Sequence, residues 1–130
     1  MTEEIIAKLI QLARQDDNIE VMWLYGSRAK GSYTAQSDFD LAIAYKDFSL
    51  SDFNRYTRPY EQALEWAMDL SLPERMISVV DINTVPIYLA FNIVAYGKVI
   101  YSQGTPRPYI EQNRIFSRFE HQQLEEKYHA

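Results

Sequence analysis

The chain has 130 residues and a mass of 15.3 kDa, the size of one ordinary domain. Its 47% hydrophobic content is enough to fill one core, which excludes a mainly disordered chain, and its net charge of −5 argues against binding duplex nucleic acid through the backbone phosphates. The sequence has no cysteine, no apolar run of about 18 residues that could span a bilayer, and no start of signal-peptide kind, so we expect a cytoplasmic protein without disulfides or thiolate metal sites.

The first part of the chain predicts one helix and two buried strands. Apolar residues recur at helical spacing over residues 2–15. The short apolar run 19–25 predicts a buried strand that ends at Gly26. A small polar loop at 31–37 then leads to an almost wholly apolar run at 39–45, which predicts a second buried strand.

A second helix is predicted over residues 51–70, with Ser51 as its N-cap. Its apolar stripe includes Phe53, Tyr56 and Tyr60. Pro59 could kink this helix or divide it into two.

The remaining elements are a third strand, two helices and a short edge strand. They are expected over residues 76–82 (strand), 86–96 (helix), 99–101 (edge strand) and 108–128 (polar helix). Together these elements predict an α/β protein, with a small mixed β-sheet flanked by helices. We expect a single domain over residues 1–130, with a core to about residue 105 and a C-terminal helical tail.

A Gly26-Ser27 pair directly follows the first strand. A strand that breaks into a helical turn there points backbone N–H groups at its end, where anions bind. The Ser27 hydroxyl could bond a phosphate oxygen, and Arg28 and Lys30 would bring positive charge close by. Taken alone, the pair could equally be an ordinary turn capped by Ser27.

Asp38 and Asp40 stand at the start of the second strand, with ten residues between Ser27 and Asp38. Side chains two apart on a strand share a face, so both carboxylates project together while Phe39 packs on the other side. Two adjacent carboxylates repel each other unless a cation lies between them, and oxygen ligands of this kind suit Mg²⁺. The alternative is that Asp38 caps the end of the loop and Asp40 is a solvated acid. An unpaired Asp40 next to an apolar strand would be energetically costly.

Asp81 is the one other acid inside a predicted buried strand. If the third strand lies beside the second, Asp81 would reach the metal from the side, as a bridging ligand or as the base for an attacking hydroxyl. A cap on the following turn is the alternative for this residue.

These residues resemble a known family. Gly26-Ser27, ten intervening residues and Asp38-X-Asp40, followed by a later strand acid, resemble the signature of DNA polymerase β-type nucleotidyltransferases, and GSRAKG with SDFDLAI resembles its form in minimal nucleotidyltransferase (MNT) proteins. The resemblance implies transfer of a nucleotide from ATP by a two-metal mechanism. Asp38 and Asp40 would then hold two Mg²⁺ ions with the help of Asp81, and the Gly26-Ser27 turn, with Arg28 nearby, would hold the β- and γ-phosphates.

The same resemblance implies a protein partner. MNT proteins of this size act as antitoxins of HEPN ribonuclease toxins, transferring AMP to a tyrosine of the toxin, which implies a hetero-oligomer. Only about fifty residues follow Asp81, which leaves little room for a domain that binds a small substrate. Two other functions stay open: an antitoxin that acts by binding and occlusion, and a nucleotidyltransferase for a small antibiotic.

Overall fold

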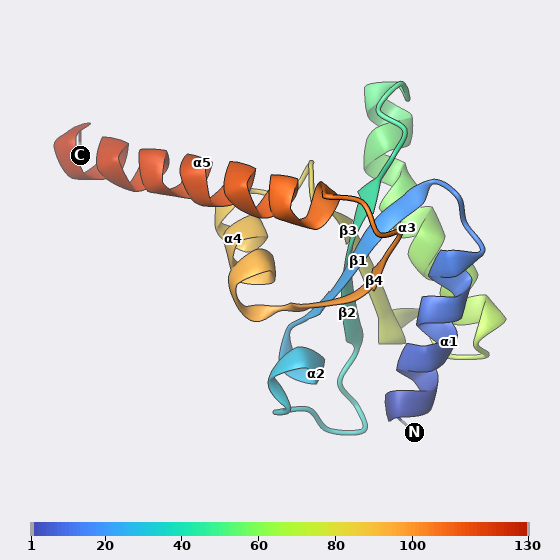
Figure 1. The fold of residues 1–130 in the computed structure, drawn as a ribbon. Coiled ribbons are helices and arrows are strands. Elements are labelled where there is room, and N and C mark those ends of the chain that lie inside the picture. The colour runs from blue at the N-terminus through green and yellow to red at the C-terminus, as the bar shows by residue number, and fades with distance from the viewer. Residues whose placement is uncertain (1, 130) are drawn as a thin grey trace.

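The computed structural model describes residues 2–129 and contains a mixed sheet with helices on both faces (Figure 1). The elements in chain order are α1 (Thr2–Arg14), β1 (Ile19–Tyr25), α2 (Ser27–Lys30), β2 (Phe39–Tyr45), α3 (Asp52–Asp69), η1 (Glu74–Met76), β3 (Ile77–Asp81), α4 (Ile87–Tyr96), β4 (Lys98–Ser102) and α5 (Arg107–His129). The expected α/β class is confirmed, and each predicted element is present within a few residues of its expected bounds.

The sheet has four strands in the order β3-β2-β1-β4. β1 pairs antiparallel with both β2 and β4, whereas β2 and β3 run parallel. The expectation that the third strand lies beside the second is therefore confirmed, as is the edge strand expected over residues 99–101. Parallel pairing of β2 and β3 requires the crossover that α3 supplies.

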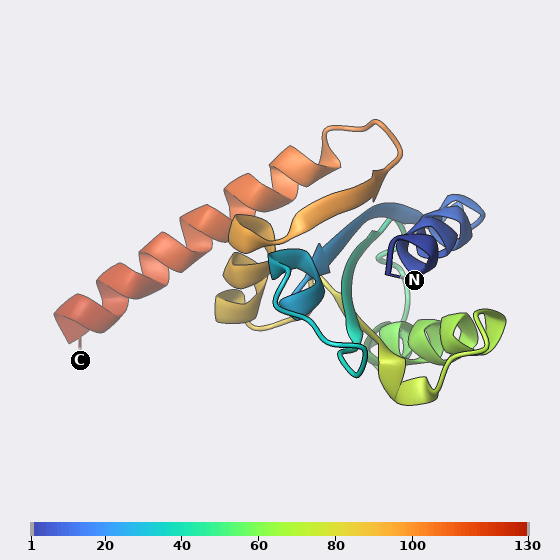
Figure 2. The same cartoon turned by 90° about the horizontal axis from the view of Figure 1, so that it is seen from below.

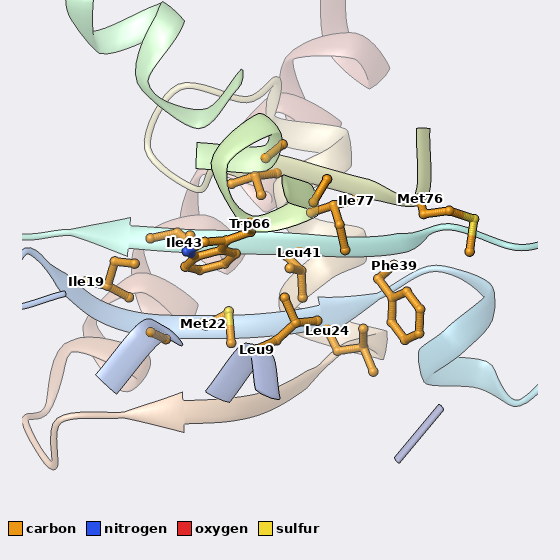
Figure 3. Close-up of a cluster of buried hydrophobic side chains, with 14 of the residues drawn as sticks. Leu9, Ile19, Met22, Leu24, Phe39, Leu41, Ile43, Trp66, Met76 and Ile77 are labelled. Carbon is orange, nitrogen blue, oxygen red and sulfur yellow. The ribbon is translucent and has the colours of Figure 1, made fainter. Parts of the chain in front are cut away.

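Helices α1 and α3 cover one face of the sheet, and α4 and α5 cover the other (Figure 2). On the first face Leu9, Leu41 and Trp66 belong to a buried apolar cluster to which α1, α3 and three strands contribute (Figure 3). On the second face Trp23 and Ile115 belong to a separate cluster. The two clusters follow from the two-residue period of the strands, whose side chains alternate between the faces.

Helix α3 runs without a break through Pro59, and the Ser51 hydroxyl caps it by accepting from the Asn54 N–H. A proline removes only its own N–H from a helix, so the bond toward residue 55 is the one that is lost. The predicted apolar stripe is wrong in part, because Phe53, Tyr56 and Tyr60 are exposed. The buried positions are Pro59, Gln62, Ala63, Trp66 and Ala67, which form the helix face toward the sheet.

Helix α5 is anchored at its start by the buried Arg107 guanidinium. Arg107 bonds the carboxylates of Glu20 and Glu111, the Asn83 side-chain oxygen and the Tyr45 carbonyl. Its last turns extend away from the rest of the chain (Figure 1). Although α5 has 23 residues, it is too polar to cross a membrane. None of the helices described between residues 2 and 129 is both long enough and apolar enough to do so.

Candidate active site

The turn between β1 and α2 leaves backbone donors free. Gly26 has φ 71°, a left-handed backbone that favours glycine, and its carbonyl accepts from the N–H groups of Ala29 and Lys30. Within residues 2–129 no hydrogen bond uses the N–H of Ser27 or of Arg28 as donor. Two backbone donors and the half-buried Ser27 hydroxyl are therefore available to an anion.

Asp38 and Asp40 are brought together as the strand period predicts. Their side chains are hydrogen-bonded to each other, while Phe39 between them is fully buried on the opposite face of the sheet. Burial, then the hydrogen bond and the charge of Asp38, raise the pKa of Asp40 to about 7. Without a cation, the Asp40 carboxyl group therefore keeps its proton up to about neutral pH.

The glycine turn and the aspartate pair form one site. Asp40 is the register partner of Tyr25, which puts its carboxylate beside the end of β1. A Cβ atom built on Gly26 would overlap the Asp40 carboxylate oxygen Oδ2. Residue 26 must therefore lack a side chain for the carboxylate to lie against the turn, and phosphate donors and acidic ligands share this end of the sheet.

The pair fits a hard divalent cation. Its donors are carboxylate oxygens in mutual contact, and in the part of the chain that the structure describes no third His, Cys, Asp or Glu groups with them. Mg²⁺ is bound through one or two carboxylates and completes its shell with water and substrate phosphate. The neighbouring N–H groups of the turn are placed for such phosphates.

The prediction that Asp81 joins this pair is wrong. Asp40 is paired with Ser78 on β3, and Asp81 lies three residues further along, opposite Ile43. Three residues correspond to about 10 Å along a strand and reverse the side-chain face. Asp81 therefore points toward α3, where its carboxylate lies 3.6 Å from the Arg58 guanidinium and accepts from the Asn83 N–H.

Asp81 is a structural acid in this position. Burial raises its pKa, and the Asn83 N–H and Arg58 oppose that shift. The cap on the following turn, which was the alternative interpretation, is the bond observed. On β3, the residue paired with Asp40 is Ser78, so this strand supplies no carboxylate beside Asp40.

Only the backbone N–H of Arg28 is free for the phosphate contact that the sequence predicts, because its side chain bonds within the protein. The Arg28 side chain is buried, and its two terminal nitrogens donate to the Thr2 hydroxyl and to the Ser37 carbonyl. Its guanidinium lies against the rings of Tyr33 and Phe39. Nη1 and Nη2 each donate within the protein, while Nε has no hydrogen-bond partner among the described residues. Arg28 therefore connects protein segments, whereas Lys30 is exposed.

The structure adds Tyr25 to the site. Tyr25 is the register partner of Asp40, so the two side chains share a face of the sheet. Burial raises the pKa of its phenol to about 12, with smaller contributions from Asp40 and Asp38. Its position directly before Gly26 was visible in the sequence, but its closeness to Asp40 depends on how β1 and β2 pair.

The sequence was also compared with known protein families and with solved structures. The family described as "Polymerase beta, Nucleotidyltransferase" matches residues 7–105, about three quarters of the chain. No curated protein matches the sequence.

Several solved structures share the fold. A chain of a toxin–antitoxin complex with AMP-PNP is 24% identical with a TM-score of 0.75, covering 94% of this chain and 92% of that one. A chain of the complex of tri-AMPylated Shewanella oneidensis HEPN toxin with MNT antitoxin is 22% identical with a TM-score of 0.71, covering 98% and 93%. A chain of the toxin–antitoxin complex MntA-HepT is 21% identical with a TM-score of 0.70, covering 96% and 92%.

Proposed function

The chain belongs to the polymerase beta nucleotidyltransferase family, and from this premise we propose that it is an antitoxin that transfers AMP from ATP to a tyrosine hydroxyl of a cognate HEPN toxin. Structures with the same fold include an MNT antitoxin in complex with a tri-AMPylated HEPN toxin and a toxin–antitoxin complex with AMP-PNP. Residues 1–130 would act as one nucleotidyltransferase unit in a hetero-oligomer. Because the reaction consumes ATP, we place it in the cytoplasm.

The observation that carries the proposal is the contact between the Gly26 turn and the Asp40 carboxylate. A triphosphate bound at the N–H groups of Ser27 and Arg28 would have its phosphates next to the Asp38–Asp40 pair. A turn that serves only the fold gains nothing from this contact, since a half-buried pair of carboxylates without a cation destabilises the fold.

The residues divide the reaction between them. The Gly26-Ser27 turn would bind the β- and γ-phosphates and orient the α-phosphorus, while Asp38 and Asp40 would hold the divalent ions. Mg²⁺ bound there would neutralise the triphosphate and lower the pKa of the attacking hydroxyl. The acceptor oxygen forms a bond to the α-phosphorus as the bond to the pyrophosphate oxygen breaks, and the hydroxyl proton passes to solvent water. Asp81 takes no part in this step, because it lies on the other face of the sheet.

The decisive experiment measures the intact mass of the cognate HEPN protein after incubation with this chain, ATP and Mg²⁺. We expect the mass to rise by whole adenylyl units. The Asp38→Asn, Asp40→Asn double variant should give no increase, whereas Asp81→Asn, the matched control, should still modify the partner.

The other outcomes separate the competing functions. A stable complex without any mass increase would replace the transferase by an antitoxin that acts through occlusion. Nucleotide transfer to an aminoglycoside or another small hydroxyl compound without any protein partner would favour the antibiotic-modifying enzyme instead.

A further inference from the structure

Arg28 connects three segments that meet at the candidate site. It lies in α2, directly after the Gly26-Ser27 turn. Its Nη2 donates to the Ser37 carbonyl at 2.8 Å, one residue before Asp38. Its Nη1 donates to the Thr2 hydroxyl at 2.7 Å, at the start of α1. One guanidinium therefore ties the phosphate turn, the aspartate segment and the first helix together.

The surroundings of Arg28 hold the guanidinium in place. Only 8% of the residue is exposed. Its Cζ lies 4.6 Å from the ring centroid of Tyr33 and 4.3 Å from that of Phe39. Tyr33 belongs to the exposed loop between α2 and β2, and Phe39 begins β2. A planar guanidinium combines stacking on rings with two directed hydrogen bonds, which an ammonium group cannot do.

The loop that Arg28 holds has few other constraints. Its residues 31–36 are all exposed. Its hydrogen bonds join Thr34 with Ser37 and with Gln36, and the Ser32 N–H donates to the Ser27 carbonyl at its start. The Arg28 bond to the Ser37 carbonyl is the described side-chain contact that holds the other end of the loop, just before β2 pairs with its neighbours. Asp38 follows immediately, so its distance from Asp40 and from the turn depends on this link.

We infer that Arg28 is a positioning residue, whose bonds to Ser37 and Thr2 set Asp38 beside Asp40 and the phosphate turn so that a divalent cation binds the pair. The inference rests on the proposed function, because the cation matters only if the site transfers nucleotides. It differs from phosphate binding by Arg28, since both terminal nitrogens are already occupied within the protein.

The test measures Mn²⁺ affinity directly, by the loss of the free Mn²⁺ signal in electron paramagnetic resonance, on the full chain without nucleotide. Arg28→Met should weaken Mn²⁺ binding by about tenfold, and Arg28→Lys by an intermediate factor, because a single ammonium cannot reach both acceptors. In the transfer assay with the HEPN protein, kcat should fall while KM for ATP at saturating Mg²⁺ changes less than about threefold, as expected when the lost contact acts on the transition state.

Arg58→Met is the matched control. Arg58 is also a largely buried arginine stacked on an aromatic ring, 3.8 Å from the Tyr45 centroid, but it belongs to α3 and contacts Asp81 on the other face of the sheet. Its loss should lower the stability of the fold and leave Mn²⁺ affinity unchanged. Asp38→Asn reports the loss of binding that an incomplete carboxylate pair causes.

Two results would overturn the inference: wild-type Mn²⁺ affinity in Arg28→Met, or a raised KM for ATP with an unchanged kcat, which would make Arg28 a phosphate ligand. If Arg28→Met does not fold, Arg28→Lys decides, and wild-type Mn²⁺ affinity there overturns it equally. Mn²⁺ binding that depends on Arg28 in a protein that transfers no AMP would instead refute the proposed function and leave this inference standing.

Discussion

Asp81 and the Asp38–Asp40 pair lie on the same sheet and have opposite surroundings. Asp81 faces α3 and has its partners in place, namely the Arg58 guanidinium and the Asn83 N–H. Asp38 and Asp40 face the other side and have mainly each other. A buried acid whose partners come from its own fold stabilises that fold, whereas a pair that repels itself needs a ligand from outside. This contrast separates a structural carboxylate from a candidate metal site.

The largest expected effect is the loss of transfer when the pair is neutralised. The Asp38→Asn, Asp40→Asn variant should lose at least about 100-fold in rate, because charge stabilisation by bound metal contributes several kcal/mol. Its thermal midpoint should not fall, since the substitution removes the repulsion. The rate is measured from the mass of the HEPN protein over time, and full activity in this variant would end the contrast drawn above.

On the other face, removing the partner of Asp81 should cost stability and spare activity. Arg58→Met leaves a buried carboxylate without its cation, and we expect a loss of about 3 kcal/mol in the free energy of unfolding. Urea denaturation measures this loss. Asp81→Asn is the control, because it removes the charge itself and should cost less. An Arg58→Met variant that is stable but inactive would contradict the division between the two faces.

A smaller effect is expected at the contact between the turn and the pair. Gly26→Ala places a Cβ on the Asp40 carboxylate and on a backbone of φ 71°. The left-handed backbone alone costs an alanine about 1–2 kcal/mol, and the displaced carboxylate should reduce transfer by about tenfold or more. Gly31→Ala is the matched control, because Gly31 also has positive φ but no atom within 4 Å of its Cβ position. Equal loss of transfer in both variants would show that strain alone is responsible.

The smallest effect is a pH dependence of stability in the absence of metal. The folded protein raises the pKa of Asp40 to about 7, so it binds a proton more tightly than the unfolded chain does. This contribution to stability is fully present below about pH 4, the ordinary aspartate pKa, and is lost as the pH rises through about 7. Because Asp40 is half exposed, we expect a change of only about 1 kcal/mol.

Urea midpoints in EDTA at acidic and at slightly alkaline pH measure this change, with Asp40→Asn as the control. The difference between the two proteins should shrink as Mg²⁺ is added at the alkaline pH, because the ion binds only the folded pair. A pH profile shared by both proteins would mean that Asp40 does not carry the effect.

The sequence by itself determined the features that depend on local geometry. Side chains two apart on a strand share a face whatever surrounds them, so the pairing of Asp38 with Asp40 and the burial of Phe39 were predictable. The strand break at Gly26-Ser27 and the cap at Ser51 were predictable for the same reason, since backbone conformation and nearby side chains decide them. The order of helices and strands followed from their hydrophobic periods.

Only the tertiary structure decided the roles of Asp81 and Arg28. The position of Asp81 depends on the register between β2 and β3, and its offset of three residues from Ser78 sends the carboxylate to the opposite face. The guanidinium of Arg28 is directed by partners 9 and 26 residues away, Ser37 and Thr2. Neither the strand register nor these long-range bonds can be seen as a periodic pattern in the sequence, because the partners meet only when the sheet and α1 have packed together.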